Sequence, residues 1–188
     1  LPENKIIFCN FGSSFKIRPD IFRIWMKILE EVPNSILWLL KSNNKAVENL
    51  KKEAANCNIN EERLIFAEKI SHDDHLERIT LADIFLDTFP YTSHTTASDF
   101  IRMGVPIITL KGESFASRVC SSILNYVGMQ TLSTNSLKKY EEKAIQLGNN
   151  NKKLKQIKKE IKNNCLNSPL FKIEDYTKDM EKKFVNLI

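Results

Sequence analysis

The sequence at residues 82–112 reads ADIFLDTFPYTSHTTASDFIRMGVPIITLKG. It begins with a short apolar run, Ile84 to Leu86, which has the length of a buried strand. After a turn of small polar residues, the pair Thr95–Thr96 begins a helical pattern, and Gly104 stands where a helix C-cap belongs. The pair Ile107–Ile108 then starts a second apolar run. The stretch therefore predicts a strand–helix–strand unit of the kind that builds parallel sheets.

The turn between the first strand and the helix carries the chemistry of this unit. A helix N-terminus presents free N–H groups and partial positive charge, so it favours bound phosphate. Thr95 and Thr96 would add hydroxyl donors there, and His94 would add an imidazole that can be charged. In an open α/β sheet, ligands bind at the carboxyl ends of the strands, where this turn must lie. A phosphate site is thus one interpretation, and a purely structural helix cap at Thr95 is the other.

Strands and helices alternate along the rest of the chain. Short apolar runs predict strands at residues 6–9, 36–40 and 63–66. Helical patterns are expected over residues 18–32, 47–55, 71–78, 119–124, 135–147, 150–165 and 173–187. Ser71 and Asp74 have the spacing of a capping box at the start of one of these helices. The pattern predicts an α/β protein with a Rossmann-like, doubly wound parallel sheet, in a single domain over residues 1–188.

Length and composition are those of one soluble domain with a full core. The 188 residues are 42% hydrophobic and 27% charged, which is ordinary for globular proteins. No apolar run reaches the ~20 residues that a membrane-spanning helix needs, and residues 1–5 lack the charged-then-apolar order of a signal peptide. The four cysteines include no C-x-x-C pair, so we expect free thiols and a cytoplasmic location. The absence of an initiator Met predicts a domain excised from a longer chain.

The formal net charge of +5 raises the question of a nucleic-acid partner. Much of the excess is lysine between Lys138 and Lys183, spaced along helical patterns and mixed with glutamate. Such runs are typical of solvated helix faces. Basic residues interleaved with stacking aromatic residues are not found there, so we expect neither a nucleic acid nor a membrane as partner.

Residues 81–119, LADIFLDTFPYTSHTTASDFIRMGVPIITLKGESFASRV, carry a family resemblance. They resemble the C-terminal catalytic half of the O-linked N-acetylglucosamine transferases and SPINDLY-like proteins, glycosyltransferase family 41. The pieces LDT, HTT-x-x-D, G-x-P and G-x-x-x-A-S-R-V stand in the family's order, and the resemblance extends from Leu1 to Phe171 and beyond. It implies the nucleotide-sugar-binding C-terminal domain of a two-domain, GT-B type glycosyltransferase.

The resemblance also implies an activity and partners. The family transfers N-acetylglucosamine from UDP-GlcNAc to Ser or Thr hydroxyls of proteins, with inversion at the anomeric carbon. An N-terminal catalytic half and helical TPR repeats would precede this segment in the same chain. We therefore expect the segment to bind UDP but to be inactive in transfer on its own.

Lys16 is the residue for which a catalytic role is expected. It follows the turn after the first strand, and so should lie at the same sheet edge as His94, Thr95 and Thr96. A lysine there can neutralise a diphosphate as a point charge. The resemblance implies that Lys16 contacts the donor diphosphate and stabilises the leaving group. Ser13 stands where the family often has a glutamine, and its shorter hydroxyl side chain reaches less far toward the phosphate.

The nucleotide base and ribose are assigned to a second segment by the resemblance. It implies that His75 and Arg78 pack beside the uracil, with the backbone of Ile70 pairing to its edge. His72 stands at a position where, in animal enzymes, a lysine contacts the ribose. Asp99 would accept hydrogen bonds from ribose hydroxyls.

His94, Thr95 and Thr96 would receive the diphosphate and the nearby sugar. Asp87 and Arg118 are expected to support the site, with a structural ion pair between them as the default interpretation.

Other chemistries are less well supported. His72, His75 and His94 could supply three imidazoles to zinc, but the nearby charges of Lys16 and Arg78 would repel a cation. With no D-x-D motif, we expect the diphosphate to be met without a metal ion, and no cofactor besides the donor substrate. Phosphate loops and dinucleotide fingerprints are absent. A different donor, GDP-fucose or UDP-glucose, and a non-catalytic scaffold domain stay open as alternatives.

Overall fold

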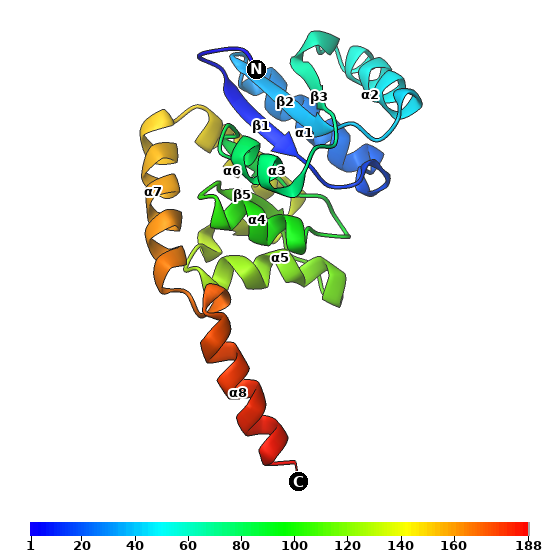
Figure 1. Ribbon diagram of the computed structural model, residues 1–188. Coiled ribbons are helices and arrows are strands. Elements are labelled where there is room, and N and C mark those ends of the chain that lie inside the picture. Colours follow the sequence, from blue (N-terminus) through cyan, green and yellow to red (C-terminus); the bar gives the residue numbers. More distant parts are fainter. Residues whose placement is uncertain (188) are drawn as a thin grey trace.

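The computed structural model describes residues 1–187, which form an α/β domain around a parallel sheet (Figure 1). Its strands are β1 (Ile6–Asn10), β2 (Ser35–Leu40), β3 (Leu64–Ala67), β4 (Ile84–Leu86), β5 (Ile107–Leu110) and β6 (Ser133–Thr134). They pair in the order β3-β2-β1-β4-β5-β6, and every pairing is parallel. The predicted doubly wound sheet is confirmed.

Helices connect the strands and cover both faces of the sheet. They are α1 (Pro19–Glu31), α2 (Asn44–Asn56), α3 (His72–Ile79), α4 (Thr95–Arg102), α5 (Phe115–Tyr126), α6 (Leu137–Gly148), α7 (Asn151–Asn167) and α8 (Ile173–Val185). Short 3-10 turns lie at Ser14–Lys16, Glu61–Arg63, Gln130–Leu132 and Pro169–Phe171. Helices α1 and α6 pack together on one face, α3, α4 and α5 lie side by side on the other, and α7 packs against both α4 and α6.

The core runs through both layers and includes a buried polar chain. Trp25 on α1 and Tyr140 on α6 are among the largest fully buried side chains. The Trp25 indole donates a hydrogen bond to the Tyr140 hydroxyl over 3.0 Å, and that hydroxyl donates to the Asp87 carbonyl oxygen over 2.9 Å. Two helices are thereby joined to the end of β4, because a buried polar group needs such a partner.

The strand order reverses between β1 and β4, which are hydrogen-bonded neighbours. The chain leaves β1 toward β2 on one side, and leaves β4 toward β5 on the other. In open α/β sheets this reversal creates a crevice beyond the carboxyl ends of the two strands. The segments that follow β1 and β4 therefore decide what the crevice can bind.

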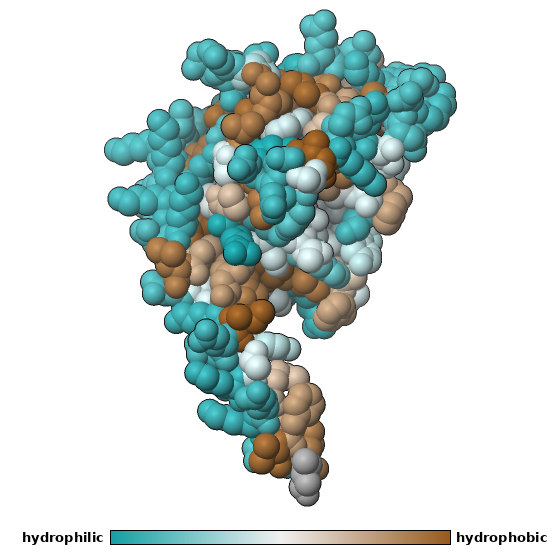
Figure 2. Space-filling view, in the orientation of Figure 1, coloured by the Kyte–Doolittle hydropathy of each residue, from teal (hydrophilic) through white to brown (hydrophobic). Residues whose placement is uncertain are grey.

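The last helix, α8, projects away from the rest of the domain (Figure 1). Its apolar side chains Ile173, Tyr176, Phe184 and Val185 are exposed, and hydrophobic atoms lie along one side of the projecting helix (Figure 2). The sequence predicted a helix to residue 187, and the structure ends it two residues earlier, at Val185.

Candidate functional site

The turn after β1 is held by Asn10, the last residue of that strand. Its side chain is buried, donates from Nδ2 to the Leu86 carbonyl oxygen over 2.7 Å, and accepts at Oδ1 from the Gly12 amide over 2.9 Å. The carboxyl end of β1 is thus joined to that of β4 by one side chain. This turn leads directly into the 3-10 turn Ser14–Lys16, so Lys16 lies at the crevice.

The turn after β4 is organised by the buried carboxylate of Asp87. Its oxygens accept hydrogen bonds from the Thr88 amide at 2.9 Å, the Ser93 amide at 2.8 Å and the Thr109 hydroxyl at 2.7 Å. Burial raises the pKa of the Asp87 carboxyl, and the hydrogen bonds oppose that rise. The backbone of the turn therefore surrounds one buried side chain. These hydrogen bonds hold the residues up to His94 in place.

The expected ion pair between Asp87 and Arg118 is wrong. Arg118 is exposed on α5, and among residues 1–187 no salt bridge joins it to Asp87. The physical reason is that the turn amides and the Thr109 hydroxyl already satisfy the Asp87 carboxylate.

Lys16 and His94 both contact the Tyr91 ring. The Lys16 ammonium lies over the Tyr91 ring, 4.0 Å from its centroid. The Tyr91 and His94 rings stack with centroids 5.1 Å apart at 20°, and Phe115 meets His94 edge-on at 6.0 Å. Partial burial lowers the pKa of the Lys16 ammonium, and the charge of Asp87 opposes this. The predicted convergence of Lys16 with the turn before α4 is confirmed.

Tyr91 itself was not among the predicted site residues. The sequence places it in a run of small polar turn residues. A large aromatic residue in such a run is unusual, and this is the signal that could have singled it out. Tyr91 is 47% exposed, so one part of the residue contacts Lys16 and His94 and another part faces solvent.

The N-terminus of α4 is open. His94 occupies the N-cap position with φ −113° and ψ −91°, and its side chain makes no capping hydrogen bond. The structural interpretation of Thr95 as the cap is therefore wrong, because Thr95 is the first residue inside the helix. Thr95 is exposed and Thr96 is half-buried. The first N–H groups of α4 are available to an anion at this end of the crevice.

A pocket of about 270 Å³ lies at the other end of the crevice and is bounded by β2, the segment after β3, and α3. Its lining residues are Phe11, Leu40, Lys69, Ile70, His72, His75 and Arg78. The structure thus brings together the four residues that the sequence assigned to the nucleotide base and ribose in this segment. A ring-lined pocket of this kind suits a flat, partly polar group.

Arg78 fixes the geometry of this pocket. Its Nε donates to His75 Nδ1 over 3.0 Å, and its Nη1 donates to the Glu68 carbonyl oxygen over 2.6 Å. Its guanidinium carbon lies 4.8 Å from the centroid of the Phe11 ring, and the Phe11 and His75 rings are 5.4 Å apart. Burial and then the Arg78 charge lower the pKa of His75. A neutral His75 accepts from Arg78 at Nδ1, so its Nε2–H is free to donate.

Asp99 lies between the two ends of the crevice. It stands one turn into α4, half-buried, and its charge opposes the lowered pKa of His75. Ser13 is exposed in the turn after β1, where its carbonyl oxygen accepts from the Lys16 amide over 3.0 Å. Both residues lie on segments that border the crevice, as predicted.

The three histidines do not form a common cluster. His94 stacks on Tyr91, whereas His75 is held by Arg78. Within residues 1–187, no three His, Cys, Asp or Glu side chains are arranged to hold a metal ion. The zinc interpretation therefore has no geometric support.

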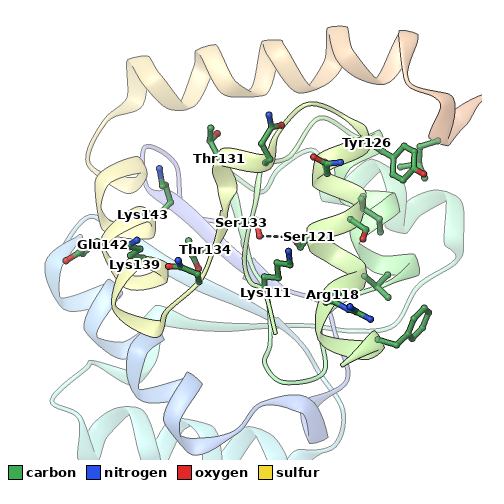
Figure 3. Close-up of a pocket in the computed structure, with 18 of the residues that line it drawn as sticks. Lys111, Arg118, Ser121, Tyr126, Thr131, Ser133, Thr134, Lys139, Glu142 and Lys143 are labelled. Atoms are coloured by element: carbon green, nitrogen blue, oxygen red, sulfur yellow. Dashed lines mark hydrogen bonds between the residues drawn. The ribbon is translucent and has the colours of Figure 1, made fainter. Parts of the chain in front are cut away.

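A second surface depression lies elsewhere, in a groove of about 1360 Å³ between α5 and α6 (Figure 3). Its lining includes Lys111, Arg118, Lys139 and Lys143, and none of the residues predicted to bind the nucleotide. The sequence predicted only solvated helix faces for Lys139 and Lys143, although their four-residue spacing places both on one side of a helix.

A match to a protein family covers nearly the whole chain. The sequence profile of Glycosyl transferase family 41 matches residues 1–180 of the chain. The chain belongs to this family.

Relatives in the family match nearly the whole chain. A probable UDP-N-acetylglucosamine–peptide N-acetylglucosaminyltransferase of Arabidopsis thaliana, SEC, is 37% identical over 188 residues, which are 100% of this chain and 19% of that protein. The Caenorhabditis elegans UDP-N-acetylglucosamine–peptide N-acetylglucosaminyltransferase is 35% identical over 96% of this chain and 16% of its own length. A probable SPINDLY transferase of Oryza sativa is 30% identical over 97% of the chain. The chain thus spans about a fifth or less of the length of these relatives.

A solved structure has the same fold. A mutant O-GlcNAc transferase of Thermobaculum terrenum superposes with a TM-score of 0.89 at 24% identity, over 98% of this chain and 38% of that one. This agreement establishes the GT-B type fold of the domain. In the described part of the chain, every helix is too short or too polar to cross a bilayer.

Proposed function

We propose that this chain is the donor-binding, C-terminal catalytic domain of an inverting protein O-glycosyltransferase that uses UDP-GlcNAc. One observation carries the proposal. The ring-lined pocket, the Lys16 ammonium and the open N-terminus of α4 border one crevice, at the carboxyl ends of β1 and β4. Family membership and the donor printed in the relatives' names support UDP-GlcNAc as the ligand.

The uracil would occupy the pocket beside His75 and Arg78. The guanidinium plane of Arg78 and the ring of His75 offer flat contacts, and the His75 Nε2–H and the backbone of Ile70 offer hydrogen bonds to the edge of the base. Asp99 and His72 would meet the ribose hydroxyls. Asp99 suits this role because it lies between the base pocket and the N-terminus of α4.

The diphosphate would lie between Lys16 and the first turn of α4. The Lys16 ammonium, the amides of α4 and the hydroxyls of Thr95 and Thr96 together supply positive charge and donors. His94 would donate to a phosphate oxygen or to the sugar, and Ser13 lies within the same turn as Lys16. These groups can meet the charge of a leaving diphosphate without a metal ion.

The reaction would be a direct displacement at the anomeric carbon. An acceptor Ser or Thr oxygen forms a bond to that carbon on the face opposite the diphosphate. The bond from the carbon to the diphosphate oxygen breaks, and its electron pair leaves with UDP, so the configuration inverts. Lys16 stabilises the charge that develops on the leaving oxygen. The hydroxyl proton goes to a base on the acceptor side, outside this chain.

The acceptor side would be supplied by other parts of a longer protein. The chain spans 19% of the SEC relative and 38% of the bacterial transferase. We propose that an N-terminal catalytic half and TPR repeats of the same protein bind the protein acceptor, in the cytoplasm. The chain alone would bind UDP and show no transfer.

Calorimetric titration of the chain with UDP and with GDP tests the proposal. We expect UDP to bind and GDP to bind at least about tenfold more weakly, because the pocket holds the smaller base. Tight GDP binding without UDP binding would instead support a GDP-sugar donor. Binding of neither nucleotide would support a scaffold domain.

Substitution of Lys16 tests its role separately. Lys16→Ala should weaken UDP binding about tenfold or more, because a charge-assisted contact to phosphate is lost. Lys45→Ala on α2 is the matched control, since Lys45 is exposed and, among residues 1–187, forms an ion pair with Glu48 alone, at 3.2 Å. Equal UDP affinity in the two variants would contradict the role of Lys16.

A further inference from the structure

The groove between α5 and α6 crosses the open edge of the sheet (Figure 3). The two helices cover opposite faces of the sheet, and β6, the last strand in the order, lies between them. In the described part of the chain, β6 pairs only with β5, so its outer edge is unpaired. A groove of about 1360 Å³ is larger than most small-molecule pockets, and an unpaired strand edge can bind an extended polypeptide.

The groove is positively charged. Lys111 follows β5, Arg118 lies on α5, and Lys139 and Lys143 lie on α6. Figure 3 shows these side chains around the same opening. Among residues 1–187, none of these four side chains has a carboxylate within 4.0 Å.

The acidic side chain in the lining already has a basic partner. Glu142 pairs with Lys138, which lies outside the lining, at 3.9 Å. Lys139 and Lys143 are four residues apart on one helix, an arrangement in which like charges repel. An anionic partner in the groove would remove this repulsion.

The floor of the groove is lined by hydroxyl and amide groups. The Ser121 and Ser133 hydroxyls are hydrogen-bonded over 2.8 Å and join α5 to β6. Thr131 and Asn135 flank the two-residue strand. Exposed strand edges and side-chain amides recognise the backbone of an extended peptide, whereas they add little to a compact phosphate ion.

One end of the groove lies beside the nucleotide site. Phe115 and Arg118 line the groove at the start of α5, and Phe115 contacts the His94 ring edge-on at 6.0 Å. A chain lying in the groove could therefore extend toward the place where the sugar is transferred.

We propose that this groove binds an acidic, extended segment of the acceptor protein, away from the residue that receives the sugar. The inference rests on the proposed function for the identity of the partner. Because β6 is only two residues long, the charges of the groove provide most of the binding affinity. The strand edge sets the direction in which the bound segment runs.

Fluorescence anisotropy with a labelled peptide of alternating glutamate and serine tests the groove directly. The chain should bind this peptide, bind a lysine–serine counterpart much more weakly, and lose affinity as salt is raised. Lys139→Glu with Lys143→Glu should weaken binding about tenfold or more, since two attractions become repulsions.

A matched control is available on α8. Lys178 and Lys182 are exposed and, like Lys139 and Lys143, four residues apart, on the helix that projects away from the domain (Figure 1). Lys178→Glu with Lys182→Glu makes the same change in net charge and should alter peptide affinity less than about twofold. Equal losses in both double variants would overturn the proposal, because net charge alone would explain the binding.

UDP titration of the same proteins separates this inference from the proposed function. Unchanged UDP affinity together with lost peptide binding in the α6 variant supports both. UDP binding by a chain that does not bind the acidic peptide overturns the groove assignment alone. Peptide binding without UDP binding overturns the proposed function and leaves the groove as a docking surface. Tighter groove-dependent binding of single-stranded DNA would assign the groove to nucleic acid instead.

Discussion

Two buried polar side chains shape the crevice. Asn10 connects the carboxyl ends of β1 and β4, and Asp87 gathers the amides of the turn that follows β4. Both are buried, and each of their side-chain nitrogen and oxygen atoms has a hydrogen-bond partner. Their contribution is to hold Lys16 and His94 in place before any ligand arrives, which lowers the ordering cost of binding.

Tyr91 should position Lys16 through its ring. Tyr91→Leu removes the face over which the Lys16 ammonium lies and on which His94 stacks. Cation–π contacts at partly exposed sites contribute about 0.5–1 kcal/mol. We expect UDP affinity, measured by calorimetry, to fall about twofold to fivefold.

Tyr91→Phe is the control for this prediction because it keeps the ring and removes only the hydroxyl. It should bind UDP as the unsubstituted chain does. If Tyr91→Phe loses as much affinity as Tyr91→Leu, the hydroxyl rather than the ring would matter.

His75 should make stability depend on pH. Its pKa is lowered in the folded chain by burial and by Arg78, so the unfolded chain binds the proton more readily. The stability linked to neutral His75 is complete above its ordinary pKa of about 6.5 and is lost as pH falls below that value. Urea unfolding from pH 8 to pH 5 should show this loss, and His75→Gln should reduce it. An identical pH profile for His75→Gln would contradict the prediction.

Individual site residues differed in how well the sequence predicted them. Lys16, His75 and Arg78 could be placed at one crevice because the strand pattern and the family motifs agree. The partners of Asp87 could not be predicted, because the sequence does not show that turn amides would satisfy its carboxylate. The contact of Tyr91 with Lys16 depends on how two turns far apart in the chain meet.

At the scale of elements, the helix α4 is defined by its two ends. Its N-terminus carries no side-chain cap, which leaves its amides for a ligand. At its C-terminus, the Gly104 amide donates to the Ile101 carbonyl and the Val105 amide donates to the Phe100 carbonyl, the pattern of a Schellman motif. The end away from the ligand is thus the well-capped one.

Gly104 should be hard to replace. It has φ +79°, a conformation that costs other residues about 1 kcal/mol or more. Gly104→Ala should therefore lower the free energy of unfolding by about 1–2 kcal/mol in urea titration. Gly104→Asn should lose less, because asparagine tolerates this conformation better. Equal losses would point to crowding against Lys162 rather than to backbone strain.

The elements were predictable where hydrophobic periodicity is strong. The apolar runs that became β1, β2, β4 and β5 are continuous, and the Gly104–Pro106 signal ended α4 as expected. Strand β6 was not predicted because Ser133–Thr134 is too short and too polar to show a strand pattern. The 3-10 turn that carries Lys16 was likewise invisible to helical periodicity.

At the scale of the whole molecule, α8 should contribute little to the stability of the domain. Its side chains are almost all exposed, and it contacts mainly the 3-10 turn Pro169–Phe171. Truncation after Lys172 should change the midpoint of thermal unfolding by less than about 2 °C. A much larger drop would show that α8 packs against the domain in solution.

The arrangement of the sheet brings the site together from distant segments. Alternating strands and helices predict a parallel sheet, and the order β3-β2-β1-β4-β5-β6 places β1 beside β4. The position of this reversal depends on the long connection through α3, not on any local signal. It brings the turn that holds Lys16 next to the turn that holds His94.

A crystal structure of the chain soaked with UDP is the most direct test of the central claim. We predict the base against His75 and Arg78, and the terminal phosphate in contact with both the Lys16 ammonium and the Thr95 amide. UDP bound in the α5–α6 groove, or bound with its diphosphate away from Lys16 and Thr95, would contradict the account.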